Sequence, residues 1–285
     1  MTRSSSRAAR AVLLETGLKA GLLVGVLAVV VAPLAAEESD ALLSGFEPTG
    51  IWRLALDGKD LPKVEIYENT RAASLLVMSS EIASPLLVDT GSRQVSTLQL
   101  LKVYKRADGR VDLLADAVLE PVSSIEIVGL EARFTLDRRA GVLKPSPFLL
   151  GDQRGPALLD SNFGYRWRAK SYEPDSAVIG RLRSERRDVR VLTFFGSWCP
   201  HCSRNLPLLL KVEQRLADAR IKFDYHGLPQ QGMSSEPAAA KWKIDGVPTA
   251  IVFLGDEEIG RIPAASWGSP EVALDLILHP ERGNG

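Results

Sequence analysis

A short apolar run that leads into a pair of cysteines is the feature of this chain that most limits its fold. Residues 191–195 are Val-Leu-Thr-Phe-Phe, and Cys199 and Cys202 follow after Gly-Ser-Trp. They are the only two cysteines in the 285-residue sequence, so no other thiol can pair with either one in a structural framework. Two cysteines separated by two residues, at the start of a predicted helix, are typical of a reversible dithiol–disulfide site.

The length and the net charge of the chain limit the number of domains and the classes of partner. At 285 residues the chain is long enough for about two domains, each with its own core. Lysine plus arginine and aspartate plus glutamate number 35 each, so the formal net charge is zero. Because no excess of positive charge is present to attract phosphates, we expect no nucleic-acid partner.

The first 36 residues predict a segment for export. A basic start, with three arginines and Lys19, precedes residues 20–36, which carry no charge. The small residues at the end of this run indicate a signal peptide cleaved after Ala35 or Ala36. The run is also just long enough for an uncleaved membrane anchor. Both interpretations place the rest of the chain in the periplasm or at the extracytoplasmic face of the inner membrane.

Residues 51–150 have the pattern of short β-strands. Three segments alternate apolar and polar side chains: 64–67, 124–128 and 133–136. We therefore predict a separate β-rich domain of six to eight strands over residues 51–150, with no assigned role. Clusters of proline, glycine and polar residues predict linkers at 37–50 and 151–164.

From residue 165 to residue 280, segments with strand and helix patterns alternate. The predicted strands are 166–169 at an edge, 191–195, 221–225, 250–254 and 258–262. The predicted helices are 176–187, 200–220, 236–242 and 270–278. This order predicts an α/β domain in which the cysteines lie between the first core strand and its helix.

This order of elements, with Trp198-Cys199-Pro200-His201-Cys202 between a strand and a helix, resembles the thioredoxin fold. A second motif, Val247-Pro248-Thr249 directly before a predicted strand, supports the resemblance. In thioredoxin-like proteins the proline at this place is cis, packs against the cysteine pair and offers backbone groups to an extended substrate. The resemblance covers roughly residues 165–280. It implies that substrates contact Trp198, Val247, Pro248 and Thr249.

The two cysteines are expected to have different roles. Backbone amides at a helix N-terminus lack intrahelical partners and favour a thiolate. We therefore predict a pKa below about 8.5 for Cys199, which makes it the attacking nucleophile. Cys202, one turn inward, is predicted to resolve the mixed disulfide. Pro200 suits the first helical turn, where its missing N–H costs nothing.

The dipeptide between the cysteines, Pro200 and His201, is predicted to tune the pKa of this pair. A partly charged imidazole would stabilise the Cys199 thiolate and raise the reduction potential, whereas a merely exposed side chain would do neither. The Pro-His dipeptide resembles the disulfide-oxidase type. However, only 45 residues separate Cys202 from Pro248, as in thioredoxins, and Thr193 stands where thioredoxins carry a buried aspartate. The direction of electron flow, reductase or oxidase and isomerase, therefore stays open.

Two other motifs support weaker hypotheses. Residues 89–92, Asp-Thr-Gly-Ser after an apolar run, match the aspartic-protease pattern. That chemistry needs two such aspartates, and a strand-to-turn junction is the ordinary alternative. The cysteine pair with His201 could bind a metal, but structural zinc takes four ligands, and only His226 and His279 remain as other imidazoles. We predict no metal and no cofactor beyond the Cys199–Cys202 disulfide.

The sequence thus predicts an extracytoplasmic protein-disulfide oxidoreductase that exchanges disulfides with protein substrates through Cys199 and Cys202. A membrane or periplasmic redox partner would reset the pair. The alternative is a binding module in which residues 51–150 do the work and the redox domain is a sensor or a metal-carrying accessory. A dimer through the β-rich domain is left open by analogy with some disulfide isomerases.

Overall fold

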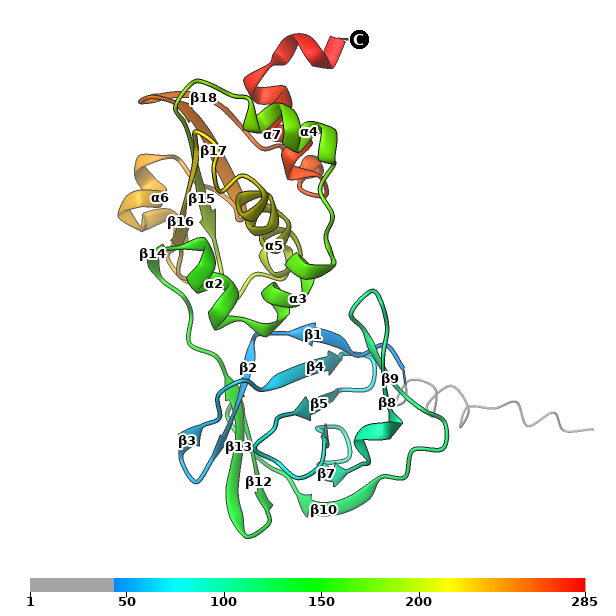
Figure 1. The fold of residues 1–285 in the computed structure, drawn as a ribbon. Helices are drawn as coiled ribbons and strands as arrows, with labels where there is room; N and C mark the ends of the chain where they lie inside the picture. The colour runs from blue at the N-terminus through cyan, green and yellow to red at the C-terminus, as the bar shows by residue number, and fades with distance from the viewer. Residues whose placement is uncertain (1–43, 285) are drawn as a thin grey trace, which may run out of the picture. The chain divides into compact units, whose positions relative to one another are not determined.

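The computed structural model describes residues 44–284 (Figure 1). They all belong to one compact unit of the chain, Ala35–Gly285. The predicted signal peptide or anchor, residues 1–36, lies outside the described residues, as does most of the predicted linker 37–50. Within residues 44–284, no helix has both the length and the apolar character needed to cross a membrane.

Residues 44–150, here the β-rich region, contain thirteen strands. Twelve of them lie within residues 51–150, where six to eight were predicted. The strands are β1 Glu47–Thr49, β2 Trp52–Leu56, β3 Lys59–Asp60, β4 Glu65–Asn69, β5 Ser74–Met78, β6 Leu86–Asp89, β7 Gln94–Thr97, β8 Val103–Lys105, β9 Val111–Leu113, β10 Glu120–Ser124, β11 Glu126–Val128, β12 Glu131–Leu136 and β13 Arg139–Pro145. A short 3-10 turn, Leu100–Lys102, precedes β8. The prediction was too low because strands of two to four residues are too short to show a periodic pattern.

These strands form two larger antiparallel sheets and one hairpin. The first sheet has the order β1-β4-β5-β6-β7-β10, the second β11-β12-β13-β2-β3, and β8 pairs with β9. Every residue of β5 is buried, because its alternate side chains enter two cores. Leu75 and Val77 pack with residues of the second sheet, whereas Leu76 and Met78 pack on the opposite face with Phe46 and its neighbours.

Residues 151–284, here the α/β region, contain a mixed five-stranded sheet and six α-helices. The strands are β14 Gly151–Gln153, β15 Val189–Phe195, β16 Ile221–Gly227, β17 Thr249–Leu254 and β18 Glu257–Arg261. The helices are α2 Gly155–Ser161, α3 Phe163–Ser171, α4 Ser176–Arg183, α5 Pro200–Arg215, α6 Pro237–Lys241 and α7 Pro270–Leu278. Short 3-10 turns lie at Met233–Ser235, Ala264–Ser266 and Pro280–Asn284.

The sheet order is β14-β16-β15-β17-β18, with β15 parallel to β16 and the other pairs antiparallel. Helix α5 covers one face of this sheet and the short helix α6 covers the other (Figure 1). Side chains of β15 alternate between the two cores. Val191 and Phe195 pack with α5 in the core that contains both cysteines, and Phe194 packs on the α6 side.

Two predicted segments differ from the structure. Residues 166–169 are not an edge strand but part of α3. Asn162 caps this helix by accepting a hydrogen bond from the backbone N–H of Tyr165 (3.0 Å), and Tyr165 and Ala169, one turn apart, are both buried. Residues 151–164, predicted as a linker, contain α2 and the edge strand β14. A three-residue strand gives no periodic signal, so the sequence could not reveal it.

Candidate active site

The N-terminus of α5 positions Cys199. This residue is the N-cap, with an extended backbone conformation, and its carbonyl oxygen accepts the first helical hydrogen bond from the N–H of Ser203 (3.0 Å). Pro200 is the first residue of the helix. The N–H of Cys199 donates to the carbonyl of Gly196 (3.0 Å), which closes the turn after β15. The free amides of the first helical turn therefore lie next to the Cys199 sulfur.

Both cysteines are thiols with little solvent contact. Cys199 is 6% exposed and Cys202 is fully buried. The Sγ atom of Cys202 accepts a hydrogen bond from the N–H of Gly196 (3.4 Å), and the thiol of Cys199 donates to the carbonyl of Val247 (3.5 Å). The pair is thus held between the turn after β15 and the segment before β17.

The two thiols have opposite pKa shifts. A hydrogen bond from Cys202 has the largest effect on Cys199. Together with the backbone amides of Cys202 and His201 and the charge of His201, it overcomes the cost of burial and lowers the pKa of Cys199 to about 6. Burial, followed by the interaction with Cys199, raises the pKa of Cys202 far above its ordinary value. At neutral pH Cys199 is therefore mainly the thiolate, whereas Cys202 keeps its proton.

Two buried hydroxyl groups in the same core find no hydrogen-bond partner among the described residues: the phenol of Tyr165 and Oγ1 of Thr193. Thr193 lies on the face of β15 that carries Val191 and Phe195. Tyr165 belongs to the core cluster of both cysteines, and burial with their nearby charge raises its pKa. The phenol therefore stays protonated near the pair. Sequence reasoning missed Tyr165 because its segment did not show a helical pattern.

No carboxylate is among the groups that shift the pKa of Cys202; these are Cys199 and the backbone of Gly196, in addition to burial. Glu213, on the same helix, accepts a hydrogen bond from the hydroxyl of Tyr225 (2.8 Å). It lies eleven residues after Cys202, about 16 Å along an α-helix. Among residues 44–284, the buried carboxylate that thioredoxins carry at the position of Thr193 thus has no replacement beside Cys202.

The peptide bond between Val247 and Pro248 is cis, as the resemblance implies. Val247, Pro248 and Thr249 are half-buried, and β17 begins at Thr249. The Thr249 hydroxyl donates to the carbonyl of Gly246 (2.8 Å), which fixes the turn before the proline. The carbonyl of Val247, which accepts from Cys199, lies on the same segment. The backbone of this segment is therefore next to the reactive sulfur.

Trp198 is held in place by its own neighbours. Its indole N–H donates to the carbonyl of Leu228 (2.9 Å), and its ring lies so close to Gly196 that a Cβ added there would be 2.5 Å from a ring carbon. The ring is half-buried. His201 is exposed, and its Nδ1 faces the guanidinium of Arg204 at 3.4 Å. The guanidinium of Arg204 therefore lies beside His201 at the exposed start of α5.

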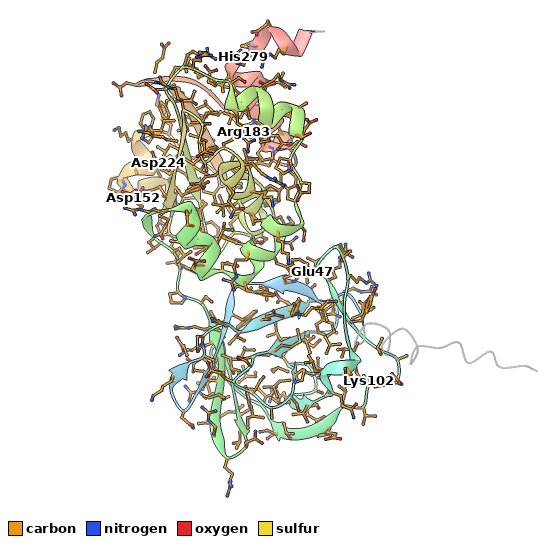
Figure 2. The ribbon with its side chains drawn as sticks, in the orientation of Figure 1. Glu47, Lys102, Asp152, Arg183, Asp224 and His279 are labelled. Atoms are coloured by element: carbon orange, nitrogen blue, oxygen red, sulfur yellow. The ribbon has the colours of Figure 1, made fainter. Side chains whose placement is uncertain are left out.

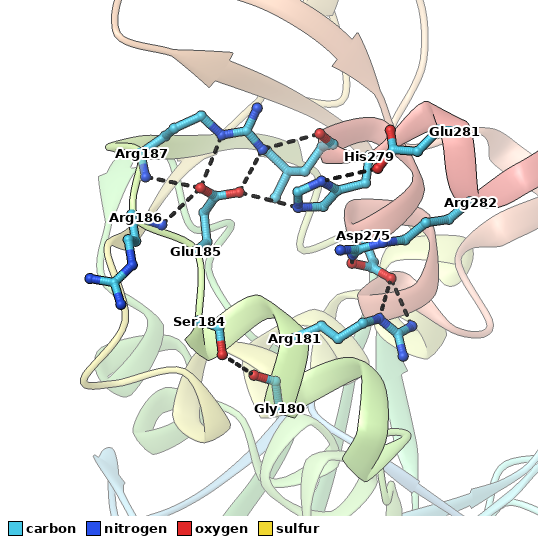
Figure 3. A network of polar contacts seen from close by, with 11 residues as sticks. Gly180, Arg181, Ser184, Glu185, Arg186, Arg187, Asp275, His279, Glu281 and Arg282 are labelled. Carbon is cyan, nitrogen blue, oxygen red and sulfur yellow. Dashed lines mark hydrogen bonds and ion pairs between the residues drawn. The ribbon is translucent and has the colours of Figure 1, made fainter.

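The two other histidines lie in separate polar clusters. His226 contacts Asp152 (2.7 Å) and Glu236 (3.4 Å), and His279 contacts Glu185 (3.3 Å) and Glu281 (3.5 Å). Asp152 and His279 are labelled in Figure 2, and Figure 3 shows the cluster around His279. Neither imidazole joins the cysteines. Across residues 44–284, no three histidine, cysteine, aspartate or glutamate side chains gather in a way that could hold a metal ion.

The Asp-Thr-Gly-Ser segment is a strand-to-turn junction. Asp89 ends β6, and its carboxylate accepts hydrogen bonds from the N–H groups of Gly91 (2.8 Å) and Ser92 (3.0 Å) and from the Ser92 hydroxyl (2.7 Å). This is the local turn chemistry expected of aspartate. The aspartate is engaged in its own turn, which favours the ordinary interpretation over the protease.

Comparisons with known proteins point to the thioredoxin-like superfamily. No protein-family model matches the chain. Thioredoxin H2-1 of Oryza sativa subsp. japonica is 32% identical over 88 residues, which cover 30% of this chain and 59% of that protein. Protein disulfide isomerase-like 2-3 of the same organism is 27% identical over 88 residues, 31% of this chain and 19% of its own length. The chain thus spans about three fifths of the first relative and one fifth of the second.

Two solved structures are also similar in part. The crystal structure of thioredoxin f2 from Chlamydomonas reinhardtii has 17% identity and a TM-score of 0.27, covering 38% of this chain and 94% of that one. A protein of unknown function from Pseudomonas aeruginosa has 19% identity and a TM-score of 0.30, covering 44% and 78%. The curated relatives, all thioredoxins or protein disulfide isomerase-like proteins, support the superfamily.

Proposed function

We propose that this protein is a thiol–disulfide oxidoreductase that exchanges disulfides with protein substrates through Cys199 and Cys202. The observation that carries the proposal is the opposite shift of two neighbouring thiols. One has its pKa lowered to about 6 at a helix N-terminus, and the other is buried with its pKa raised. The similarity to thioredoxins and protein disulfide isomerase-like proteins supports the same chemistry.

In the reducing direction the reaction has two displacement steps. The Cys199 thiolate attacks one sulfur of a substrate disulfide, the substrate S–S bond breaks, and the departing sulfur takes up a proton. Cys202 then loses its proton and attacks Sγ of Cys199, which releases the second substrate sulfur as a thiol. The substrate gains two electrons and two protons, and the Cys199–Cys202 disulfide forms. The oxidising direction runs through the same mixed disulfide in reverse.

The segment before β17 would hold the substrate. The backbone of Val247 and Thr249, on either side of the cis proline Pro248, offers hydrogen-bonding groups to an extended peptide, in the manner of strand addition. The carbonyl of Val247 lies 3.5 Å from the Cys199 sulfur, so a peptide bound there has its own sulfur within reach. The half-buried ring of Trp198 forms a further part of this surface.

The setting follows from the export segment expected over residues 1–36. We place the reaction in the periplasm or at the extracytoplasmic face of the inner membrane, where a membrane or periplasmic redox partner resets the pair. The redox-active disulfide is the only cofactor in this scheme, and no metal takes part. The charge of His201 stabilises the reduced form of the pair and so raises its reduction potential. This favours the oxidising direction, in which the Cys199–Cys202 disulfide accepts electrons from substrate thiols.

The test is trapping of the mixed disulfide. Full-length protein is mixed with insulin and dithiothreitol, which re-reduces the Cys199–Cys202 disulfide after each cycle, and reduction of the insulin disulfides is followed. In a second assay, reduced protein freed of dithiothreitol is mixed with insulin, and covalent adducts are followed on non-reducing gels. We expect turnover for the wild type, none for Cys199→Ser, and a stable adduct with Cys202→Ser, because the resolving step is missing. Turnover by Cys199→Ser, or the absence of both turnover and adduct, would overturn the proposal.

A further inference from the structure

A cavity of about 610 Å³ opens beside Cys199. One wall comes from the α/β region, with Cys199, Trp198, Tyr165 and Arg168, and the other comes from the β-rich region. A cavity of this size suits a small ligand or a short peptide segment. The redox pair therefore does not face open solvent on this side but a walled space.

The walls of this cavity are joined by specific contacts. The indole N–H of Trp167 on α3 donates to the carbonyl of Gly109 (2.6 Å), and a Cβ at Gly109 would lie 2.5 Å from the Trp167 ring. Arg168, one residue later, pairs with Glu47, the first residue of β1 (3.2 Å); Glu47 is labelled in Figure 2. The close approach of Trp167 requires glycine at position 109, where φ is also positive.

The charged residues of the cavity are mostly arginines. Six charged side chains line it: Arg71, Arg106, Arg110, Arg168, Glu47 and Glu68. Glu47 contacts both Arg168 (3.2 Å) and Arg110 (3.9 Å), and Arg106 pairs with Asp112 (2.5 Å). Arg110 also lies 3.5 Å from Asp108. Two of the four arginines thus share one glutamate, and the lining carries more positive than negative charge.

Arg71 stands apart from these pairs. Its side chain is exposed and makes no ion pair or hydrogen bond with any residue of the described part of the chain; only its backbone N–H is engaged, by Asn69 (3.1 Å). The nearest acid in sequence, Glu68, has its pKa raised by burial, which reduces its tendency to carry charge. An unpaired guanidinium at the cavity with Cys199 is a ready partner for a carboxylate.

A second polar group at the cavity also lacks a partner. The hydroxyl of Tyr165 is buried, its residue is only 1% exposed, and it finds no hydrogen-bond partner in residues 44–284. A buried polar group without a partner is destabilising, because it has lost its hydrogen bonds to water. Burial raises the pKa of this phenol, so it stays protonated, and Tyr165 forms part of the cavity wall. Tyr165 and Arg71 are therefore two independent unsatisfied donors at one cavity.

We propose that this cavity binds substrate disulfides that carry carboxylates next to their sulfur atoms, and so selects acidic substrates for the redox pair. The inference rests on the proposed function and names its substrate class. Arg71, the lining arginine without an acidic partner, holds a carboxylate, and Cys199 then attacks the neighbouring sulfur by the balanced steps given above. A carboxylate next to a disulfide sulfur is present both in an acidic loop of a protein and in a small acidic disulfide.

The test compares disulfides that differ in charge. Reduced full-length protein is mixed with glutathione disulfide (acidic), hydroxyethyl disulfide (neutral) or cystamine (basic). Each second-order rate constant is divided by that of dithiothreitol with the same disulfide, which removes the intrinsic reactivity. At low salt we expect the acidic substrate to exceed the basic one by about tenfold or more, with the ratio shrinking in high salt.

The variants locate the origin of this preference. Arg71→Gln should reduce the acidic-to-basic ratio by about threefold or more, because it removes the unpaired guanidinium. Arg138→Gln is the matched control: Arg138 is an exposed arginine outside the cavity, and no ion pair of it is found among the described residues, so the ratio should not change. A ratio unchanged in Arg71→Gln, or equally reduced in both variants, overturns the assignment.

The remaining outcomes separate the two proposals. Exchange with all three disulfides at equal normalised rates overturns the acidic selection but leaves the oxidoreductase in place. Absence of exchange with every disulfide overturns the proposed function itself. A six-residue acidic cysteine peptide disulfide, measured beside glutathione disulfide, distinguishes the two sources. The faster of the two identifies the source, provided that its rate also falls in Arg71→Gln.

Discussion

In its protonated form, the thiol of Cys199 donates a hydrogen bond to the carbonyl oxygen of Val247, with 3.5 Å between the two atoms. The two residues are 48 positions apart in the chain. One is the N-cap of α5, and the other forms the cis peptide bond with Pro248. This contact brings the reactive sulfur to the backbone that would bind a substrate strand, so nucleophile and docking segment form one site.

The first prediction concerns the pH dependence of Cys199. Its pKa is lowered to about 6, so the thiolate fraction rises between about pH 5 and pH 7 and is nearly complete above that. Alkylation of the reduced protein by iodoacetamide, measured as a second-order rate against pH, should rise through the same interval and then level off. Cys199→Ser should lose this fast phase. A rate that keeps rising through about pH 8.5, the value of a free thiol, would contradict the shift.

The same shift predicts a change in stability. When the pKa of a group is lower in the folded state than in the unfolded state, its ionised form stabilises the folded protein. This contribution is fully present when the pH is above the pKa of the unfolded state, and it is lost as the pH falls through the pKa of the folded state. The free energy of unfolding of the reduced wild type, relative to Cys199→Ser, should therefore be larger at pH 9 than at pH 5. Urea denaturation of both proteins at the two pH values measures this difference. Equal differences at pH 5 and pH 9 would show that the thiolate is not stabilised by the fold.

His201 is predicted to raise the reduction potential of the pair. The charge of His201 is one of the causes that lower the pKa of Cys199, and it therefore stabilises the reduced form of the cysteine pair. His201→Ala should therefore lower the potential by about 10–30 mV, measured by equilibration with glutathione buffers. His226→Gln is the control, since His226 is engaged by Asp152 and Glu236. An unchanged potential in His201→Ala would make this histidine a merely exposed residue.

Two glycines predict opposite effects on stability. A Cβ at Gly196 would lie 2.5 Å from the Trp198 ring, so Gly196→Ala should lower the free energy of unfolding by about 1–3 kcal/mol. Gly180, within α4, has no atom within 4 Å of an added Cβ, so Gly180→Ala should raise it by about 0.5–1 kcal/mol. Urea denaturation measures both. Similar losses in the two variants would show that the contact with Trp198 is not what excludes a side chain at Gly196.

The unsatisfied hydroxyl of Thr193 predicts a stabilising substitution. Thr193→Val keeps the shape of the side chain and removes a buried group that lacks a partner, which should raise the free energy of unfolding by about 1 kcal/mol. Thr249→Val removes a hydroxyl that donates to the carbonyl of Gly246, and should lower it by about 0.5–1.5 kcal/mol. If both substitutions lower the free energy of unfolding equally, the hydroxyl of Thr193 does make a hydrogen bond, and the prediction is wrong.

The local motifs carried most of the information that the sequence could give. The cis bond at Pro248 is expected only from the resemblance to thioredoxin-like proteins, because an X–Pro bond is cis in only about 5–6% of cases. By contrast, the helix that follows Cys199 and the helix 270–278 depend on short-range signals: a proline in the first turn and a periodic apolar face. The aspartate cap of α4 at Asp175 is equally local. Such elements are predictable because neighbouring residues alone determine them.

Elements that depend on distant contacts could not be predicted. Helix α3 is charged and only weakly amphipathic, and it forms because Tyr165 and Ala169 enter a core built by residues far along the chain. The strand β14 has three residues and exists through its pairing with β16. For the same reason the cavity at Cys199 could not be predicted, since its arginines come from segments that only the folded chain brings together.

A redox titration of Cys199 and Cys202 measures whether this pair exchanges reversibly between dithiol and disulfide. The full-length protein is equilibrated in a series of glutathione buffers, and free thiols are counted by alkylation and mass spectrometry. We predict one two-electron transition, with a midpoint between about −270 and −120 mV, that is absent in Cys199→Ser and in Cys202→Ser. Cysteines that stay unpaired across the whole series, or that pair only between molecules, would contradict the account.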